Sequence, residues 1–335
     1  MKKLSDLSVL ALTGMFLCLM GFGAKPALAQ EYTFRAGHTF DPSNPTAKAI
    51  AHYAELVEKE SKGRIKITIH PAGSLGDFAE LYDQQKMGAL ELSYFGFPTG
   101  SRDNRKLSFD DLPYLWPDVD TAIKALNGDL GKIVTPIMYQ LGLKMLNYTE
   151  PLGFRHFTNN VRPIYKPADL KGLKIRIYPS ELRLEAFKAM GISATPMPFG
   201  EIYTALKLKT IDGQENPLSI INSQKFYEVQ KYLSLTRHLL TNGGLAFSRP
   251  LWEKLPKDVQ DLLQKCAKMS EEYDIRVFKE SEAQALGQLK EKGMQVNEVN
   301  FADFKNLVKP VYKKWAPVLG PEIVEVLKKA TGSEF

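Results

Sequence analysis

The segment Tyr32–His70, with the sequence YTFRAGHTFDPSNPTAKAIAHYAELVEKESKGRIKITIH, predicts a strand, a helix and a second strand in succession. Ser43 and Asn44 are candidate caps for a helix over 45–61, and Pro45 suits its first position because no free N–H is needed there. An apolar stripe follows at helical spacing: Ala47, Ile50, Ala54 and Val57. Two strands that flank such a helix predict a parallel pair in an α/β layer.

The same alternation continues along the chain, with a helix expected over 77–87 and a strand over 90–95. In open α/β sheets, ligands bind at the carboxyl ends of the strands, beside helix N-termini that favour anions. The residues that follow the first and third strands are therefore candidate walls of a binding crevice. They are Gly37–Thr39, which include His38, and Gly96–Thr99, which include Phe97.

A second α/β pattern begins near Gly153. It predicts strands over 154–158, 173–178 and 194–197 and helices over 181–190 and 200–208. Side chains alternate along a strand, so Arg176 and Tyr178 point away from the face that carries Ile175 and Ile177. Arginine suits the capture of a carboxylate, because its planar fork of N–H donors stays charged when desolvated. The alternative is that Arg176 is a solvated side chain at the sheet edge, as most lone charges are.

The stretch 257–286 contains neither glycine nor proline, and it predicts one long helix. At 1.5 Å per residue it would span about 45 Å, which exceeds one small domain. Its apolar residues at helical spacing are Val259, Leu262, Leu263, Cys266, Met269, Tyr273 and Val277. Such a stripe needs a core to cover it, so we expect the helix to cross between two domains, the alternative being a helix that projects for dimerisation. Cys266 lies on the stripe and is expected to be a buried, inert thiol.

Residues 1–29 have the pattern of a secretory signal peptide. Lys2 and Lys3 precede an apolar run from Leu7 to Phe22, and Ala27-Leu28-Ala29 provides a small-x-small cleavage site. The apolar run is too short for a membrane span to be expected. We therefore expect an exported protein that begins at Gln30 after cleavage.

The composition of the remaining chain excludes several classes of function. Cleavage leaves 41 Lys and Arg against 37 Asp and Glu, a net charge of +4, and the charges alternate in sign along the chain, which argues against a nucleic-acid partner. Only Cys266 remains of the two cysteines, so no intramolecular disulfide can form. The five histidines show no metal-ligand spacing, and no metal or other cofactor is expected.

Taken together, the motifs resemble one family, the solute receptors of tripartite ATP-independent periplasmic (TRAP) transporters, over essentially the whole mature chain. Eight landmarks occur in the family's order: Ser61-Lys-Gly-Arg-Ile-Lys-Ile67, Pro71-Ala-Gly-Ser-Leu-Gly76, Asp111-Leu-Pro-Tyr114, Gly153-Phe-Arg155, Asp169-Leu-Lys-Gly-Leu-Lys-Ile-Arg176, Pro196-Met-Pro-Phe199, Asp212-Gly-Gln-Glu-Asn-Pro217 and Lys225-Phe-Tyr-Glu-Val-Gln-Lys231. The resemblance implies an α/β periplasmic binding protein fold of two domains, with hinge strands, a long domain-spanning helix and a ligand sealed in the cleft. We expect domain 1 to comprise 30–152 and 242–280, and domain 2 to comprise 153–241 and 281–335.

The resemblance also assigns candidate ligand contacts. Arg176 matches the arginine that forms the carboxylate salt bridge in this family, and Arg155 matches a second arginine that in many members reaches the same anion. Asn216 matches an asparagine that hydrogen-bonds the carboxylate, and Phe199 matches an aromatic residue packed near it. An arginine fork and an amide together can fill the lone-pair sites of a desolvated carboxylate.

Two departures from the family pattern bear on the other end of the ligand. Tyr178 stands where a small residue or proline is frequent, and Gly96-Phe97 stands where the sialic-acid receptors present an acidic residue. With Tyr94, Phe95 and Phe199, they supply aromatic side chains near the cleft, although alternation lets only one of Tyr94 and Phe95 face it. We hypothesise a small monocarboxylate with an apolar or aromatic tail, the alternative being that most of these rings belong to the core.

Three functions remain in competition. The first is a periplasmic receptor that closes on an organic carboxylate and delivers it to a TRAP membrane permease. The second is a secreted enzyme, for which no nucleophile elbow, carboxylate pair or other catalytic residues stand out in the sequence. The third is a sensor module that docks, with its ligand, on a signalling protein. A receptor that is no enzyme and acts as a monomer is the expected answer.

Overall fold

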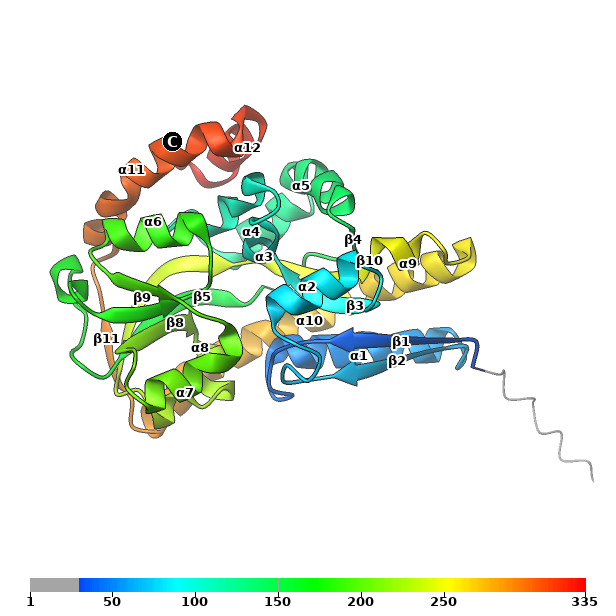
Figure 1. Ribbon diagram of the computed structural model, residues 1–335, viewed down its shortest axis with the longest axis horizontal. Coiled ribbons are helices and arrows are strands. Elements are labelled where there is room, and N and C mark those ends of the chain that lie inside the picture. The colour runs from blue at the N-terminus through cyan, green and yellow to red at the C-terminus, as the bar shows by residue number, and fades with distance from the viewer. Residues whose placement is uncertain (1–29, 150) are drawn as a thin grey trace, which may run out of the picture.

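The protein forms two β-sheets, each covered by helices, in a computed structural model that describes residues 30–149 and 151–335 (Figure 1). The predicted signal peptide, 1–29, lies outside the described residues. The first sheet has the strand order β2-β1-β3-β10-β4 and the second the order β11-β9-β5-β8-β6-β7. This is the two-sheet α/β architecture that the alternating pattern predicted.

The strands of the first sheet are β1 Tyr32–Gly37, β2 Ile65–His70, β3 Leu92–Gly96, β4 Leu143–Met145 and β10 Gly243–Ser248. Those of the second are β5 Gly153–Asn159, β6 Lys174–Ile177, β7 Ser193–Pro196, β8 Gly213–Pro217, β9 Tyr232–Thr241 and β11 Gln295–Glu298. The α-helices are α1 Pro45–Glu60, α2 Phe78–Lys86, α3 Phe97–Gly100, α4 Val119–Leu126, α5 Asp129–Gln140, α6 Glu181–Ala189, α7 Ile202–Lys207, α8 Leu218–Ser223, α9 Arg249–Trp252, α10 Lys257–Glu291, α11 Phe301–Leu319 and α12 Pro321–Thr331. Four 3₁₀ segments complete the fold: η1 Arg105–Asp111, η2 Pro167–Leu170, η3 Phe199–Glu201 and η4 Phe226–Glu228.

The first sheet begins as predicted. Strands β1 and β2 are parallel, as are β1 and β3, and the later strand β10 inserts antiparallel to β3. Helix α1 is capped by Asn44, whose side chain accepts a hydrogen bond from the Thr46 N–H at 3.0 Å. All four residues of the predicted stripe are buried, so the helix packs on the side that the sequence indicated.

Besides helix α10, two chain crossings in the described residues connect the sheets near their contact. Strand β9 passes into β10 through Asn242, which is held by Asp110: the Asn242 N–H and side-chain Nδ2 donate to its carboxylate at 2.9 and 2.6 Å. Burial raises the pKa of Asp110 to about 7. The other crossing ends at Gly153, whose φ of +109° favours glycine, and an added Cβ would lie 3.2 Å from Phe278. These crossings are the expected hinge strands.

Helix α10 runs behind both sheets, packing against α1 on one side and α8 on the other (Figure 1). It is longer than predicted, with 35 residues. Cys266 is buried and has a free thiol, as expected. The predicted stripe was wrong at Met269, which is 44% exposed. Polar residues Ser270 and Asp274 occupy the buried positions instead, and an apolar pattern could not find them.

The domain boundaries stay a prediction. All strands of the first sheet lie within 32–145 and 243–248, and all those of the second lie within 153–241 and 295–298. The C-terminal helices contact both sides, since α11 packs against α6 and α12 packs against α4 and α5. Within the described residues, we find no helix that is both long and apolar enough to cross a membrane.

Candidate functional site

A small cavity lies between the two sheets. Of the two candidate walls, Gly96–Thr99 contributes to its lining and Gly37–Thr39 does not. The volume of this cavity that is open to the centres of water molecules is about 40 Å³. One water needs about 10–15 Å³ by this measure, so the cavity suits a compact molecule. Its walls are formed by Phe78, Tyr94, Gly96, Pro98, Thr99, Leu152, Arg155, Arg176, Tyr178, Arg183, Phe199, Asn216, Ile220 and Thr241.

Arg176 is the least satisfied charged group of this cavity. It lies on β6, is 1% exposed, and donates from Nε to the Met197 carbonyl at 2.9 Å. Its Nη2 is buried and has no hydrogen-bond partner among the described residues. Burial, together with the nearby charges of Arg155 and Arg183, lowers the pKa of Arg176 to about 9. A guanidinium in this state favours an anionic partner.

The other two arginines already have anionic partners. Arg155 forms an ion pair with Glu215, donating from Nη2 to Oε1 at 2.9 Å and also bonding through Nε. Arg183 donates from Nε to Asp111 at 2.9 Å and from Nη1 to Glu215 at 3.2 Å. Burial would raise the pKa of Glu215, but the two arginines outweigh it and hold that pKa well below its ordinary range.

The charges of this buried set are therefore unequal. Glu215 and Asp111 pair with Arg155 and Arg183, whereas Arg176 is attracted by Asp77 and Glu215 without an ion pair to either, so its positive charge is the least compensated. A buried surplus charge is costly unless a counter-ion neutralises it. The arrangement can bind one negative charge, and a carboxylate matches the geometry of the fork.

Asn216 lies beside the arginines on β8 and is 1% exposed. Its Nδ2 donates to the Gln214 side-chain oxygen at 2.5 Å, which uses one of the two amide protons. Thr241, at the end of β9, contacts Arg155 Nη1 at 3.5 Å. The site can therefore offer an amide and a hydroxyl beside the Arg176 fork.

Aromatic rings cover the rest of the cavity. Phe199 and Phe78 pack edge to face with their ring centroids 5.6 Å apart, and Phe78 meets the Tyr178 ring at 6.3 Å. Tyr94 lines the cavity, whereas Phe95 packs against Tyr82 in the core, so the alternation expected for this pair is confirmed.

Two hydrogen bonds join the walls across the cleft. The Phe199 N–H donates to Asp77 at 2.7 Å, and Asp77 also caps α2 by accepting from the Phe78 N–H at 2.8 Å. The Tyr178 hydroxyl donates to Thr99 at 3.0 Å. Both bonds connect the side of the second sheet to that of the first, so the two walls are held closed.

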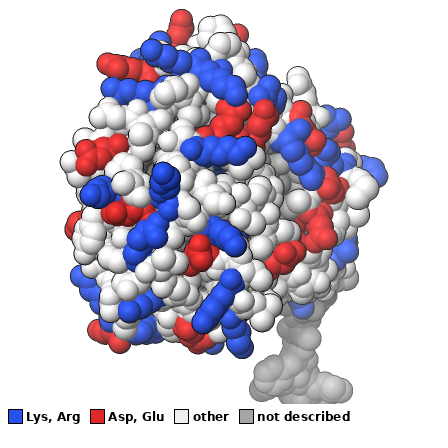
Figure 2. Space-filling view, turned by 60° about the vertical axis from the view of Figure 1, so that its left-hand side comes forward, with Lys and Arg blue, Asp and Glu red and all other residues white. Residues whose placement is uncertain are grey.

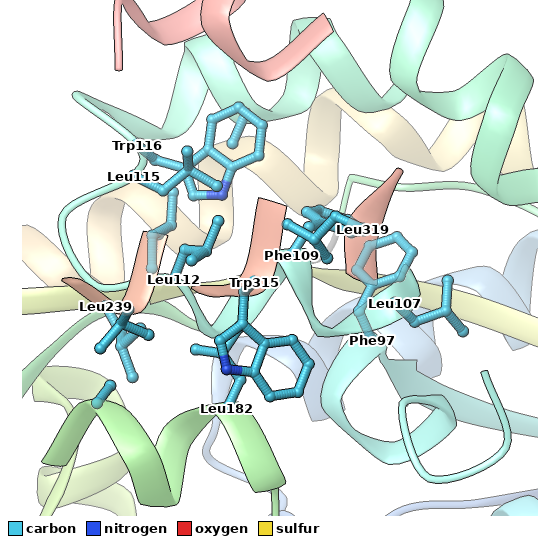
Figure 3. Close-up of a cluster of buried hydrophobic side chains, with 14 of the residues drawn as sticks. Phe97, Leu107, Phe109, Leu112, Leu115, Trp116, Leu182, Leu239, Trp315 and Leu319 are labelled. Carbon is cyan, nitrogen blue, oxygen red and sulfur yellow. The ribbon is translucent and has the colours of Figure 1, made fainter. Parts of the chain in front are cut away.

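Five of the seven predicted contact residues line this cavity: Arg155, Arg176, Tyr178, Phe199 and Asn216. Phe97 lies in the hydrophobic core, where it packs 4.9 Å from Phe109, in the cluster of buried side chains shown in Figure 3. His38 is buried with its ring against Phe40, and burial lowers its pKa to about 4. Neither residue is part of the cavity lining. Both follow a strand that points toward the cleft, but their side chains turn into the packed interior.

The sequence reasoning did not assign five of the lining residues or the two carboxylates that pair with the arginines: Phe78, Leu152, Arg183, Ile220 and Thr241, and Glu215 and Asp111. Phe78 directly follows the helix cap Asp77, and that position next to the crevice was a usable signal. Glu215 and Asp111 stand inside two quoted motifs, but no pattern in the sequence paired them with arginines distant in the chain.

Comparison with known proteins gives a consistent result. Residues 36–317 match the family described as bacterial extracellular solute-binding protein, family 7. The C4-dicarboxylate-binding periplasmic protein of Rhodobacter capsulatus is 30% identical over 91% of this chain and 93% of its own length.

Two solved structures are also similar. The sugar acid binding protein of Advenella mimigardefordensis, in complex with galactonate, superposes with a TM-score of 0.87 at 33% identity, covering 90% of this chain and 98% of its own. A TRAP periplasmic solute binding protein from Polaromonas sp. JS666, bound to D-erythronate, gives 0.85 at 30% identity, covering 91% and 100%.

Proposed function

The chain belongs to the bacterial extracellular solute-binding protein family 7, the solute receptors of TRAP transporters, and on that premise we propose that it captures a small monoanionic carboxylate and delivers it to a TRAP permease. The observation that carries the proposal is the buried Arg176, whose Nη2 has no partner in the described residues. A single carboxylate would neutralise the positive charge of Arg176, because Arg155 and Arg183 already pair with Glu215 and Asp111.

The assignment of roles follows from the partners of each group. Arg176 would hold the carboxylate through its fork, and Asn216 would donate its remaining amide proton to it. Arg155 and Arg183 are fixed by Glu215 and Asp111, so they would contribute mainly to the electrostatic field and the shape of the cavity. Receptors of this family serve transport, and the expectation of no catalysis rests on that.

The body of the ligand is the finer part of the proposal. Phe78, Tyr94, Tyr178 and Phe199 surround the space beyond Arg176, which supports a compact monocarboxylate with an apolar or aromatic tail. A polyhydroxylated monocarboxylate is the second candidate, because the similar proteins from Advenella and Polaromonas bind galactonate and D-erythronate. The Thr99 and Tyr178 hydroxyls could serve such a ligand.

Localisation in the periplasm and a monomeric state complete the proposal. Family membership and the predicted signal peptide support export, and no partner other than the solute and the permease is invoked. On the face drawn in Figure 2, basic and acidic side chains are interspersed, which gives no support to nucleic-acid binding. A sensor role would use the same cavity and differ only in the docking partner.

The test is native mass spectrometry of protein purified from its host without refolding, followed by denaturation and identification of the released acid. A copurified monocarboxylate that raises the melting temperature when added back is the expected result. A calorimetric panel then compares 4-methyl-2-oxopentanoate, D-erythronate and succinate. Binding restricted to D-erythronate or succinate would overturn the apolar tail, and an empty cavity that no organic acid fills would overturn the receptor role.

A further inference from the structure

A second concave site lies on the other side of the hinge strands from the ligand cavity. This rear groove has a cavity volume of about 490 Å³, within the range of about 300–1,000 Å³ that is usual for small-molecule sites. It is lined by Asp118, Val119, Phe154, His156, Leu218, Leu235, Arg237, Phe278, Lys279, Glu282, Leu286 and Glu298. The comparisons and the proposed receptor role do not account for it.

The rear groove and the ligand cavity share structural elements. On β5, Arg155 lines the cavity and the next residue, His156, lines the groove. Strand β9 supplies Thr241 to the cavity and Arg237 to the groove. Helix α8 likewise contributes to both. A molecule in the groove would therefore contact the elements that hold the solute anchor, and it would also touch α4 and α10.

The backbone is irregular where these strands line the groove. Arg155 pairs with Leu239, but Phe157 pairs with Ser234, so β9 bulges between the two pairs. Arg237 lies in this bulge with a φ of +45°, which is uncommon for a residue other than glycine. Bulges re-aim side chains, and strained positions cluster at functional sites.

The bulge places unengaged hydrogen-bond donors at the groove. Arg237 is exposed, its guanidinium lies over the Phe154 ring at 4.3 Å, and that guanidinium has no hydrogen-bond or ion-pair partner in the part of the chain that is described. The Arg237 backbone N–H donates to His156 Nδ1 at 3.3 Å. A neutral ring that accepts at Nδ1 carries its proton on Nε2, so His156 offers a second donor. Two such donors suit a carboxylate.

Acidic groups stand in the same groove. Glu282 accepts a hydrogen bond from the Ser219 N–H at 2.9 Å, and Glu298 at the rim has no side-chain partner among residues 30–149 and 151–335. The rim carries charges of both signs. Lys279 pairs with Asp120 at 2.8 Å, and Asp118 accepts from the Thr121 N–H at 2.6 Å. Among the described rim residues, Arg237 and Glu298 are therefore the charged pair left for a ligand. The floor between these groups is apolar.

From these observations we propose that the rear groove binds a small zwitterion with an apolar body, of the class of the apolar α-amino acids. Arg237 and His156 receive its carboxylate, Glu298 and Glu282 its ammonium group, and Phe154, Phe278 and the neighbouring leucines its side chain. Because the groove contacts α4 as well as β5 and β9, its occupancy biases the relative position of the two sheets. Binding there is therefore coupled to solute binding in the cavity.

Calorimetry with leucine, methionine and phenylalanine tests the proposal, with 4-methylpentanoate and 3-methylbutylamine as analogues that each lack one charge. The analogues are compared with leucine in Arg176→Ala, whose cavity should no longer bind carboxylates. At least one amino acid is expected to bind, and both analogues of leucine to bind this variant more weakly than leucine does. Arg237→Asn tolerates the positive φ and removes the charge, so it should weaken binding about 10-fold or more. The matched control is Arg276→Ala, another guanidinium over a ring, Tyr273, but outside the groove.

Arg176→Ala separates this proposal from the receptor role. It should abolish carboxylate binding in the cavity and leave amino-acid binding in the groove intact. Amino-acid binding that is lost in Arg176→Ala and kept in Arg237→Asn would assign it to the cavity and overturn the rear site. Failure of all three amino acids to bind the wild-type protein at millimolar concentration would overturn it as well.

Discussion

Replacement of Arg176 by alanine should nearly abolish solute binding while the fold persists. Burial and neighbouring guanidinium groups lower the pKa of Arg176 from its ordinary value to about 9. At about 1.4 kcal/mol per pKa unit, that shift corresponds to a penalty of roughly 5 kcal/mol for keeping the charge in the empty cavity. A bound carboxylate would offset this penalty. Removal of one partner of such a buried pair costs about 2–5 kcal/mol, which weakens binding about 30-fold to several thousand-fold.

The same numbers predict little loss of stability. The substitution removes the bond from Arg176 Nε to the Met197 carbonyl, which costs about 1 kcal/mol, but it also removes an uncompensated buried charge. Thermal melts without ligand should therefore show a melting temperature no lower than that of the wild type. Arg176→Lys keeps the charge and loses the planar fork, so its affinity should fall between the two.

Isothermal titration with the acid recovered from the native protein measures the effect. Lys174→Ala is the matched control, because Lys174 lies on the same strand, is exposed and has no part in the cavity. It should bind as the wild type does. An affinity of Arg176→Ala that stays within about threefold of the wild type would refute the reasoning, since this lies far below the cost of an unpaired buried charge.

Three further outcomes are expected. Burial raises the pKa of Glu282 to about 7, above its unfolded value, so the free energy of unfolding should fall by up to about 3 kcal/mol as the pH rises from about 4.5 past 7. Thermal melts of Glu282→Gln at pH 5 and pH 8 should lack this fall in stability. An equal fall in both proteins would contradict the prediction. Asp77→Ala removes the acceptor of the Phe199 N–H across the cleft, so solute release measured by stopped flow should accelerate about 10-fold. Asp77→Asn keeps one acceptor oxygen, so its release rate should lie in between. An unchanged release rate would show that this hydrogen bond does not hold the cleft closed. Burial raises the pKa of Cys266 to about 11, so the native thiol should resist a thiol reagent that labels the unfolded chain, and rapid native labelling would disprove its burial.

Local patterns predicted the parts of the fold that depend on neighbouring residues. The cap at Asn44, the stripe of α1 and the parallel pairing of β1 with β2 follow from residues close in sequence. The prediction that Met269 belongs to the buried face of α10 was wrong, because Ser270 and Asp274 occupy the buried positions in that part of the helix. Asp274 accepts bonds from Ser270 and from Thr149, which is distant in the chain, at 3.0 and 3.4 Å. Only the tertiary partner makes that position suitable for a carboxyl group.

The functional site shows the same difference between features set by neighbouring residues and features set by distant ones. A resemblance of motifs was enough to name Arg176, Arg155 and Asn216, because each stands inside a recognisable segment. The ion pairs that distinguish the arginines could not be inferred, since Glu215 is 60 positions from Arg155 along the chain and Asp111 is 72 from Arg183. Sequence reasoning therefore found the cationic residues and missed the balance of charge that sets their roles.

That balance explains how the solute could control closure. Arg176 is unpaired when the walls are joined by the bonds of Asp77 and Tyr178 and no anion is present, so the empty closed state carries a penalty of roughly 5 kcal/mol. In an open cleft, water would solvate the same guanidinium and reduce the penalty, while the repulsion from Arg155 and Arg183, on the same side of the cleft, would remain. The carboxylate thus stabilises the closed state chiefly by cancelling a charge, and a neutral molecule of the same shape should leave the protein open.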